Sequence, residues 1–383
     1  MQPLSPRAVA LPESGIRRIT NAAVAIPGCI RLEMGEPQFA TPAHICEAAA
    51  RAARDGFTKY TASQGLLSLR EAMSAKLARV NGLDVPPDRI VATNGALSGL
   101  FTTCLALLAP GDEMLIPDPG WPNWEQMILI AGGRVVRYPT PRVRGFLPDP
   151  ARMDALVTPR TRAIILNSPS NPTGAVMPQP LVEAMLDFAR RHDLWVISDE
   201  CYDECVFDGS HVSPARCDTD GRVISLFSCS KTYAMTGWRV GYAAVPDGAI
   251  NVLAKLQQPV LGNICSVAQK AAEAALTGPQ DCVGEMRDYY RARRDQAVSM
   301  LAAADMPVDR PGGAFYLMID VSAANPDATA FALDLLQTHR VAVAPGETFG
   351  PGGAGLVRIA LCASEDAIAR GLATLIDVVR SAR

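Results

Sequence analysis

Short apolar runs alternate with helix-length stretches from residue 90 to residue 245, and this alternation constrains the fold more than any other feature of the sequence. Such alternation is typical of βαβ crossover units, so it predicts a mostly parallel sheet covered by helices. Folds of this class bind their ligands in loops beyond the carboxyl ends of the strands. The predicted strands cover residues 90–92, 113–116, 134–138, 163–166, 195–198, 223–227 and 240–245.

Helices are predicted on both sides of these strands. A helix over residues 42–54 would have Thr41 as its N-cap and Pro42 at its first position, and a helix over residues 67–80 would end at Asn81-Gly82. Later in the chain, the predicted helices cover residues 249–276, with an interruption near Pro259, and residues 282–304 and 364–380. We therefore expect an α/β protein with a large domain at 46–280 and a smaller α/β domain at 281–383. Residues 1–45 would form an N-terminal arm and part of the small domain.

The composition argues against several classes of partner. A net charge of −3 over 383 residues leaves no basic stripe for nucleic acid or anionic lipid. The ten cysteines have no paired spacing, and the first residues carry no apolar signal segment, so we expect reduced, mostly buried thiols in a cytoplasmic protein. The dispersed histidines give no metal site. The run at residues 350–355 fits G-x-G-x-x-G but leads into a strand, so it is not a dinucleotide fingerprint.

Residues 223–246 carry only two charges, Lys231 and Arg239, in an otherwise apolar segment. Because a buried unpaired cation is costly, such a lysine is either paired with an anion or held neutral, and a neutral lysine can form a Schiff base. Ser228, Ser230 and Arg239 have the chemistry of phosphate ligands. The segment therefore indicates an aldehyde cofactor with a phosphate group.

Polar residues also follow two neighbouring predicted strands. Asn171 lies in NSPSNPTG directly after the run AIIL, while Asp199 ends LWVIS and Tyr202 follows it. Taken singly, the first is consistent with an ordinary turn and the second with a helix cap. Because the carboxyl ends of parallel strands meet at one edge of the sheet, we expect these residues to gather with Lys231.

With these motifs in place, the chain resembles the class I and II, fold type I pyridoxal-phosphate aminotransferases. The resemblance rests above all on NSPSNPTG and SCSKTYAMTGWR, and also on LEMGEPQFATP, YTASQGLLSLREAM, VATNGALSGLF, DPGWPNWEQM, ISDECYDE, PGGAFYL and VRIALC. It implies that Lys231 holds the cofactor as an internal aldimine and moves protons as a base and acid. Asp199 would keep the pyridine nitrogen protonated, and Tyr202 and Asn171 would hydrogen-bond the ring oxygen.

The resemblance also implies the remaining contacts. The helix that opens at Asn94 with Gly95, Ala96 and Leu97 would direct free N–H groups at the phosphate. Tyr60 matches a tyrosine that reaches the phosphate from the neighbouring subunit, which would make the site a property of a homodimer. Trp121 would stack on the cofactor ring, with Trp124 as the alternative. Arg358 would bind the substrate carboxylate, unless it pairs with an acid such as Glu347. Gly35 would approach the same carboxylate, unless it is a plain turn glycine.

We therefore expect a cytoplasmic, homodimeric aminotransferase that passes the amino group of an L-amino acid to a 2-oxo acid, 2-oxoglutarate by family analogy. A β-lyase or cyclising synthase on the same scaffold stays open, as does a non-catalytic sensor. A broad or aspartate-like donor range is favoured, against a neutral side-chain pocket formed by Ile16, Trp121 and Phe349. The role of Cys229 is not indicated. A distal carboxylate would need a further cation, and the candidates are Arg17, Arg18, Arg142 and Arg144.

Overall fold

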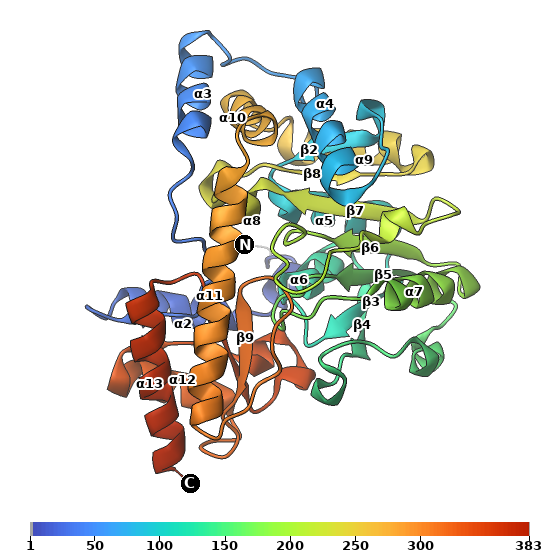
Figure 1. The fold of residues 1–383 in the computed structure, drawn as a ribbon. Coiled ribbons are helices and arrows are strands. Elements are labelled where there is room, and N and C mark those ends of the chain that lie inside the picture. The colour runs from blue at the N-terminus through green and yellow to red at the C-terminus, as the bar shows by residue number, and fades with distance from the viewer. Residues whose placement is uncertain (1–2, 383) are drawn as a thin grey trace.

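The computed structural model describes residues 3–382, and its largest element is a seven-stranded sheet (Figure 1). The strand order is β2-β8-β7-β6-β5-β3-β4. The prediction of a mostly parallel sheet is confirmed, with β8 as the exception because it runs antiparallel to β2 and to β7. The strands are β2 (Ile90–Thr93), β3 (Glu113–Asp118), β4 (Arg134–Pro139), β5 (Thr161–Asn167), β6 (Trp195–Asp199), β7 (Val223–Ser228) and β8 (Gly241–Ala244).

Helices cover both faces of this sheet, as its apolar strands require. One face packs against α5 (Gly95–Leu107), α6 (Asn123–Ile130) and α9 (Asp247–Leu261) around Ile116, Ile165 and Leu226. The opposite face packs against α7 (Gln179–Arg191) around Leu115, Ile164 and Val196. Neighbouring positions along a strand point to opposite faces, so each strand contributes to both cores.

A third layer consists of α3 (Ala43–Arg54), α4 (Leu67–Lys76) and α10 (Ser266–Thr277). One detail of the helix predictions is wrong here. Thr41 is not the cap of α3, because Pro42 stands at that position and the Thr41 hydroxyl donates to the carbonyl oxygen of Ala234 at 2.7 Å. The predicted interruption near Pro259 is confirmed: Pro259 lies in the last turn of α9, and the helix ends before Gly262, which adopts a φ of +73°.

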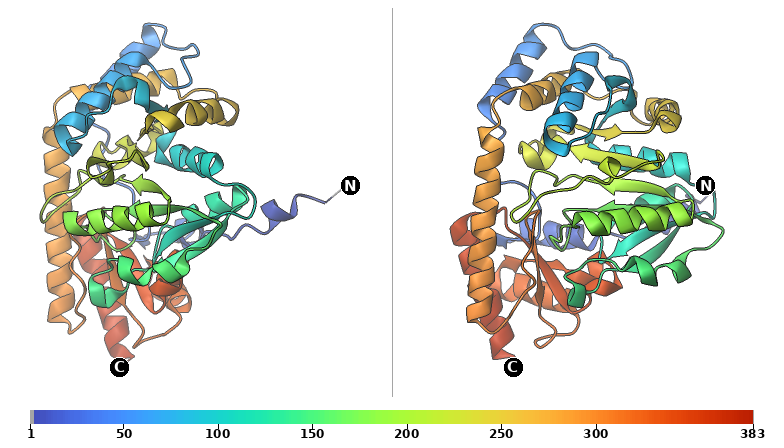
Figure 2. Two further views of the ribbon diagram at one scale, coloured as in Figure 1. Left: turned by 90° about the vertical axis from the view of Figure 1, so that its right-hand side faces the viewer. Right: turned by 45° about the vertical axis from the view of Figure 1, so that its right-hand side comes forward.

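The C-terminal part of the chain builds a second, smaller α/β unit (Figure 2). Helix α11 (Asp281–Ala303) runs alongside both units; its Val283 packs in the core with α10, and its Leu301 packs in the core of the smaller unit. The domain boundary near residue 280 stays a prediction, because α11 packs in both cores. The other elements of the smaller unit are β9 (Tyr316–Asp320), α12 (Ala328–His339), β10 (Val341–Ala342), β11 (Ala344–Pro345), β12 (Leu356–Ala360) and α13 (Glu365–Ser381).

The N-terminal residues contain short regular elements that the sequence analysis did not predict. Helix α2 (Gly15–Val24) buries Ile19 and Ala23 in the core of the smaller unit, and β1 (Ile30–Arg31) pairs with β10. The short α1 (Pro6–Val9) lies on the segment that extends from the body, and Arg7 contacts the carbonyl oxygen of Ile130 at 3.2 Å (Figure 2). Ile16, Ile19 and Ala23 stand at helical spacing in α2, so this pattern could have predicted the helix.

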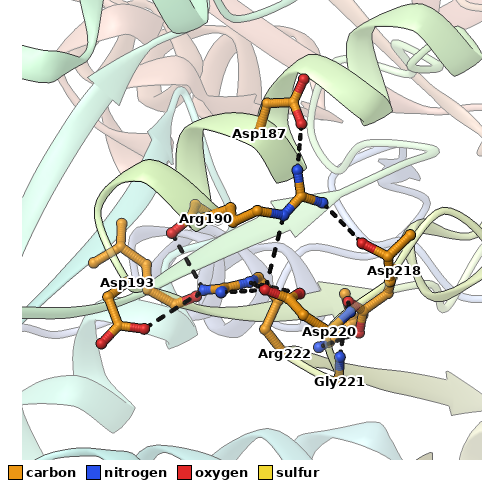
Figure 3. Close-up of polar contacts among 11 residues, drawn as sticks. Asp187, Arg190, Asp193, Asp218, Asp220, Gly221 and Arg222 are labelled. Atoms are coloured by element: carbon orange, nitrogen blue, oxygen red, sulfur yellow. Dashed lines mark hydrogen bonds and ion pairs between the residues drawn. The ribbon is translucent and has the colours of Figure 1, made fainter.

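Charged side chains at the amino ends of β6 and β7 are paired with one another (Figure 3). The Arg222 guanidinium pairs with Asp220 and donates to the carbonyl oxygen of Leu194 at 2.9 Å, while Arg190 pairs with Asp187 at 2.6 Å. Asp218 accepts hydrogen bonds from backbone N–H groups, including that of Val223 at 2.9 Å. At this edge of the sheet the arginines therefore have acidic or carbonyl partners within the fold.

Candidate active site

A cavity of about 270 Å³ lies at the carboxyl edge of the sheet, where the strand topology places ligands. It brings together predicted residues from β6, β7, α5, α8 (Cys229–Thr232) and β12, which are far apart in the sequence. The predicted residues that line it are Gly35, Ala96, Leu97, Trp121, Asn171, Asp199, Tyr202, Ser228, Ser230, Lys231, Arg239 and Arg358, with Trp124 among them as well. Gly95 adjoins the cavity through its contact with Arg239.

Lys231 lies on α8, immediately after β7, and its side chain reaches into the cavity. Its Nζ donates a hydrogen bond to the carbonyl oxygen of Gly35 at 2.6 Å. Within residues 3–382, no carboxylate forms an ion pair with this lysine, and burial lowers its pKa below the usual lysine value. A lysine whose neutral form is favoured is suited to nucleophilic attack on a carbonyl group.

Asp199 ends β6 and is 5% exposed. Its Oδ1 accepts a hydrogen bond from the backbone N–H of Cys201 at 3.3 Å. Burial raises the pKa of Asp199, and the described part of the chain offers its carboxylate no cationic partner. A buried carboxylate in this state is stabilised by a ligand that presents a positive charge or a hydrogen-bond donor.

An anion site lies between α5 and the loop that follows α8. The Arg239 guanidinium donates to the carbonyl oxygen of Thr236 at 2.7 Å, and no acidic side chain among the described residues pairs with it. A Cβ added to Gly95 would lie 2.4 Å from Arg239 Nη2, so only glycine lets the arginine approach the start of α5. Ser228 Oγ accepts from the N–H of Ser230, which leaves its hydroxyl proton free to donate.

Arg358 stands on β12 and is 2% exposed. Its Nη1 donates to Asn171 Oδ1 at 2.9 Å, and its Nη2 donates to the carbonyl oxygen of Glu33. The proposed alternative of an ion pair with Glu347 is not found, because that carboxylate accepts from the N–H of Ala328 at 2.9 Å. Burial lowers the pKa of Arg358. A buried arginine with neutral partners is suited to bind a carboxylate from the ligand.

Two pairs of aromatic side chains complete the walls. The hydroxyls of Tyr202 and Tyr316 lie 2.8 Å apart, and either can be the donor. Trp121 and Trp124 meet edge to face with their ring centroids 6.1 Å apart. Trp124 is 1% exposed, whereas Trp121 is half-buried, so Trp121 has more surface to offer a ligand.

Several predicted residues lie elsewhere. Tyr60 is 96% exposed and borders a separate hollow with Phe57 and Leu261, away from the cavity of its own chain. Ile16 and Phe349 were expected to line the cavity, but neither does. Phe349 is fully buried, and the Arg358 guanidinium lies over it, 4.8 Å from the centroid of the Phe349 ring. Arg17, Arg18, Arg142 and Arg144 do not line the cavity either.

Sequence reasoning missed five cavity residues. Tyr316 lies in PGGAFYL, a motif that the resemblance already included, so taking each residue of the motif in turn would have found it. Asn167 ends the apolar strand β5, which is the signal used for Asp199. Leu100, Cys201 and Thr236 carry no distinguishing pattern. Neither a membrane-spanning helix nor a cluster of three or more metal-ligating side chains is present in residues 3–382.

The expectation of mostly buried thiols is only partly met. All ten cysteines are free. Three are buried, namely Cys104, Cys229 and Cys362, while the others are partly buried or exposed.

Known proteins resemble this chain over almost its whole length. Residues 27–375 match the family described as aminotransferase class I and II. The aspartate/prephenate aminotransferase of Thermus thermophilus is 39% identical over 90% of this chain and 89% of its own. The arginine–pyruvate transaminase of Pseudomonas aeruginosa is 39% identical over 86% of this chain and 84% of its own. The solved structure of Thermus thermophilus aspartate aminotransferase with maleate has a TM-score of 0.94 and 38% identity, covering 99% and 100% of the two chains.

The chain belongs to the class I and II aminotransferases, a family of pyridoxal-phosphate-dependent transaminases. Its own cavity fits that cofactor. Asp199, which has no cationic partner within residues 3–382, suits the protonated ring nitrogen, and the half-buried Lys231 suits the aldehyde. The approach of Arg239 to Gly95 suits the phosphate.

Proposed function

We propose that this aminotransferase takes the amino group from a broad range of L-amino acids, aspartate included, and passes it to 2-oxoglutarate. Pyridoxal phosphate, when bound, supplies the aldehyde that accepts the amino group and the ring that withdraws electrons from the substrate Cα. The observation that carries the proposal is the cavity itself, in which Asp199, Lys231 and Arg358 lie without counter-charges from residues 3–382.

The side chains of the cavity would transfer the proton, stabilise the cofactor ring and orient the substrate. Lys231 would hold and release a proton at its Nζ, because burial lowers its pKa and makes the neutral form easier to reach than in an ordinary lysine. Asp199 would hold the positive charge of the ring nitrogen. Arg358 would orient the substrate by binding its carboxylate with two parallel hydrogen bonds. Asn171, whose Oδ1 is engaged by Arg358, would donate from its Nδ2 to the ring oxygen beside Tyr202.

Phosphate binding would fall to Arg239, Ser228 and Ser230, with Gly95, Ala96 and Leu97 supplying the first turn of α5. Trp121 would cover the ring. Gly35 would provide backbone close to the substrate carboxylate, which its 2.6 Å contact with Lys231 Nζ supports. The ten free cysteines support the proposal of a cytoplasmic protein.

The breadth of donors is supported by the relatives, whose names include aspartate, prephenate and arginine. Among residues 3–382 of one chain, three basic side chains line the cavity: Lys231, Arg239 and Arg358. Each has a proposed role near the reacting centre. A distal carboxylate would therefore need a cation from outside this set, as from a second copy of the chain.

We propose a homodimer with shared sites, in which Tyr60 of one copy reaches the phosphate of the other. The exposure of Tyr60 at a hollow of its own chain supports this arrangement. Coexpression of Lys231→Ala and Tyr60→Ala chains tests it, because a mixed dimer would contain one intact site. Activity well above that of either variant alone is expected, and no recovery would contradict the proposal.

The function is tested by incubating the loaded enzyme with a panel of amino acids, each with 2-oxoglutarate, and measuring glutamate. Aspartate, arginine, an aromatic and a small neutral amino acid form the core of the panel, with pyruvate as a second acceptor. Glutamate formation from several donors is expected. Release of ammonia and pyruvate from β-substituted amino acids, without glutamate, would instead identify a lyase, and binding without turnover would identify a sensor.

A further inference from the structure

Tyr316 lies where the proposed carboxylate end and the proposed ring end of the cavity meet. It begins β9, is 2% exposed and lines the cavity. Its hydroxyl lies 2.8 Å from that of Tyr202. The Arg358 guanidinium lies over its ring, 4.3 Å from the centroid. One side chain therefore contacts both the arginine that would bind the substrate and the phenol that would contact the cofactor.

The position of the Tyr316 hydroxyl is closely confined. A Cβ added to Gly35 would lie only 1.8 Å from this oxygen, so the hydroxyl fills the space in which any other residue at position 35 would place its side chain. Tyr202 confines it on another side, and the rings of Tyr202 and Tyr316 meet edge to face at 5.7 Å. A hydroxyl fixed in this way can hold the orientation of its hydrogen-bond partner.

Each phenol has one proton to donate, so only one of the two hydroxyls donates within the pair. Burial raises the pKa of Tyr316 to about 12, with the Arg358 cation acting to lower it. Burial raises the pKa of Tyr202 well above its usual value, and the neighbouring Tyr316 raises it further. The Arg358 guanidinium lies 4.3 Å from the centroid of the Tyr316 ring, and a cation over a phenol ring makes its hydroxyl the better donor. Donation by Tyr316 leaves the proton of Tyr202 free for another acceptor.

We propose that Tyr316 is a positioning residue that donates its hydroxyl proton to Tyr202, so that Tyr202 directs its own proton at the ring oxygen of the cofactor. This inference rests on the proposed function. It also couples the two ends of the cavity, because a carboxylate that neutralises Arg358 removes the cation from the face of the Tyr316 ring. Tyr316 then becomes a weaker donor as substrate binds.

The expected signature is a change in the pKa of the proton at Lys231 Nζ in the loaded enzyme. A proton donated to the ring oxygen disfavours retention of the Lys231 proton, so loss of that donation raises this pKa. The titratable and charged side chains that face the two phenols and Lys231 remain in place in the variants below. They are Glu36, Cys201, Cys205, Arg239, Arg358 and Cys362.

The test is a pH titration of the absorbance of the lysine-bound cofactor in wild type, Tyr316→Phe, Tyr202→Phe and the double variant. Tyr316→Phe keeps the ring beneath Arg358 and removes only the hydroxyl. We expect its titration midpoint to move to higher pH, by less than in Tyr202→Phe, and the double variant to match Tyr202→Phe alone. A fall in kcat/KM of about tenfold, the scale of one hydrogen bond, should accompany the shift.

Tyr290→Phe is the matched control, because Tyr290 is also a tyrosine with 2% exposure and its hydroxyl has no hydrogen-bond partner within the described residues. Its midpoint should equal that of wild type. An unchanged midpoint in Tyr316→Phe, or a double variant whose shift is the sum of the single shifts, overturns the proposal. If Tyr316→Phe does not fold, Tyr316→Leu also removes the hydroxyl, and an unchanged midpoint in that variant overturns the proposal equally. Its kcat/KM is not compared, because it also removes the ring beneath Arg358. A wild type without the lysine-bound absorbance would instead refute the proposed role of Lys231.

Discussion

Lys76 and Lys231 are both withdrawn from solvent, and their partners differ. Lys76 Nζ pairs with Asp203 and lies 3.7 Å from Glu204 Oε1. Asp203 Oδ2 also accepts a hydrogen bond from Asn81 Nδ2 at 2.9 Å. Lys231 has a backbone carbonyl oxygen as its hydrogen-bond partner and no carboxylate among residues 3–382. One lysine is thus part of a closed ion-pair cluster, while the other is open to a ligand.

The pKa shifts of the two lysines follow from this difference. Burial by itself lowers the pKa of Lys76, but Asp203 and Glu204 outweigh it and hold the pKa above the usual value. At Lys231, burial dominates and the pKa is lowered. Burial alone therefore does not identify a reactive lysine. The arrangement of carboxylates around the lysine decides between structure and chemistry.

The largest expected effect follows from removing the open lysine. Lys231→Ala should abolish the absorbance of the lysine-bound cofactor and lower turnover by at least about 10⁴-fold, because the side chain is both the attachment point and the proton carrier. Thermal unfolding should stay close to wild type, since no ion pair is broken. Lys255→Ala changes an exposed lysine and serves as the control. A retained absorbance in Lys231→Ala would remove the basis of the comparison.

Removing Lys76, the lysine of the ion-pair cluster, should lower the free energy of unfolding rather than act directly on catalysis. Lys76→Met leaves Asp203 buried without its cation, which should cost about 3–5 kcal/mol of unfolding free energy in a urea titration. Lys270→Met, which breaks a more exposed pair with Glu273 at 2.9 Å, should cost less than about 1 kcal/mol. Adding Asp203→Leu to Lys76→Met should recover part of the loss. If Lys76→Met is as stable as the control, the cluster is not structural.

The unpartnered carboxylate of the cavity gives the third prediction. Asp199→Asn should lower kcat by about 10²–10³-fold, the scale of one lost preorganised electrostatic contact. The cofactor-free variant should unfold at the same temperature or higher, because burial raises the pKa of Asp199 and makes its charged form costly. Asp309→Asn is the control for loss of a carboxylate, because Asp309 lies outside the cavity and pairs with Arg142 at 3.0 Å. Loss of both activity and stability would indicate a structural role.

The smallest effect is a difference in how the two lysines respond to pH. The pKa of Lys231 is 10.5 in the unfolded chain and lower in the folded protein. Between these two pKa values the unfolded chain binds more protons, so the free energy of unfolding rises with pH. The folded pKa of Lys76 lies above 10.5, so its contribution is complete below 10.5 and is lost as pH rises toward the folded value. Urea midpoints of the cofactor-free protein on either side of pH 10.5 measure this. Lys231→Ala should flatten the rise and Lys76→Met the fall, and parallel curves would contradict the assignment.

The sequence predicted the sheet and most of the cavity because both depend on local patterns. Each strand of the large sheet lies within one or two residues of its predicted bounds, since apolar runs flanked by turn residues are readable without tertiary information. Asp199 and Lys231 were found because polar residues at strand ends stand out from their neighbours.

What the sequence did not predict depends on contacts between distant segments. The hydroxyl of Thr41 bonds to Ala234, nearly two hundred residues away, and no local signal distinguishes this from a helix cap. The pair of Tyr202 and Tyr316 likewise depends on the packing of β9 against the loop after β6. The place of Phe349 beneath Arg358, rather than in the cavity, is also set by tertiary packing.

The conformation of Arg239 affects how strongly the cavity binds an anion. This residue adopts a φ of +56°, an uncommon conformation for a residue with a side chain, and its guanidinium is already tied to Thr236. A free arginine loses about 2 kcal/mol of rotamer entropy when it is immobilised. Here the hydrogen bond to Thr236 already restrains the exposed side chain, so an arriving anion meets a partly preorganised partner and keeps more of its interaction energy as affinity.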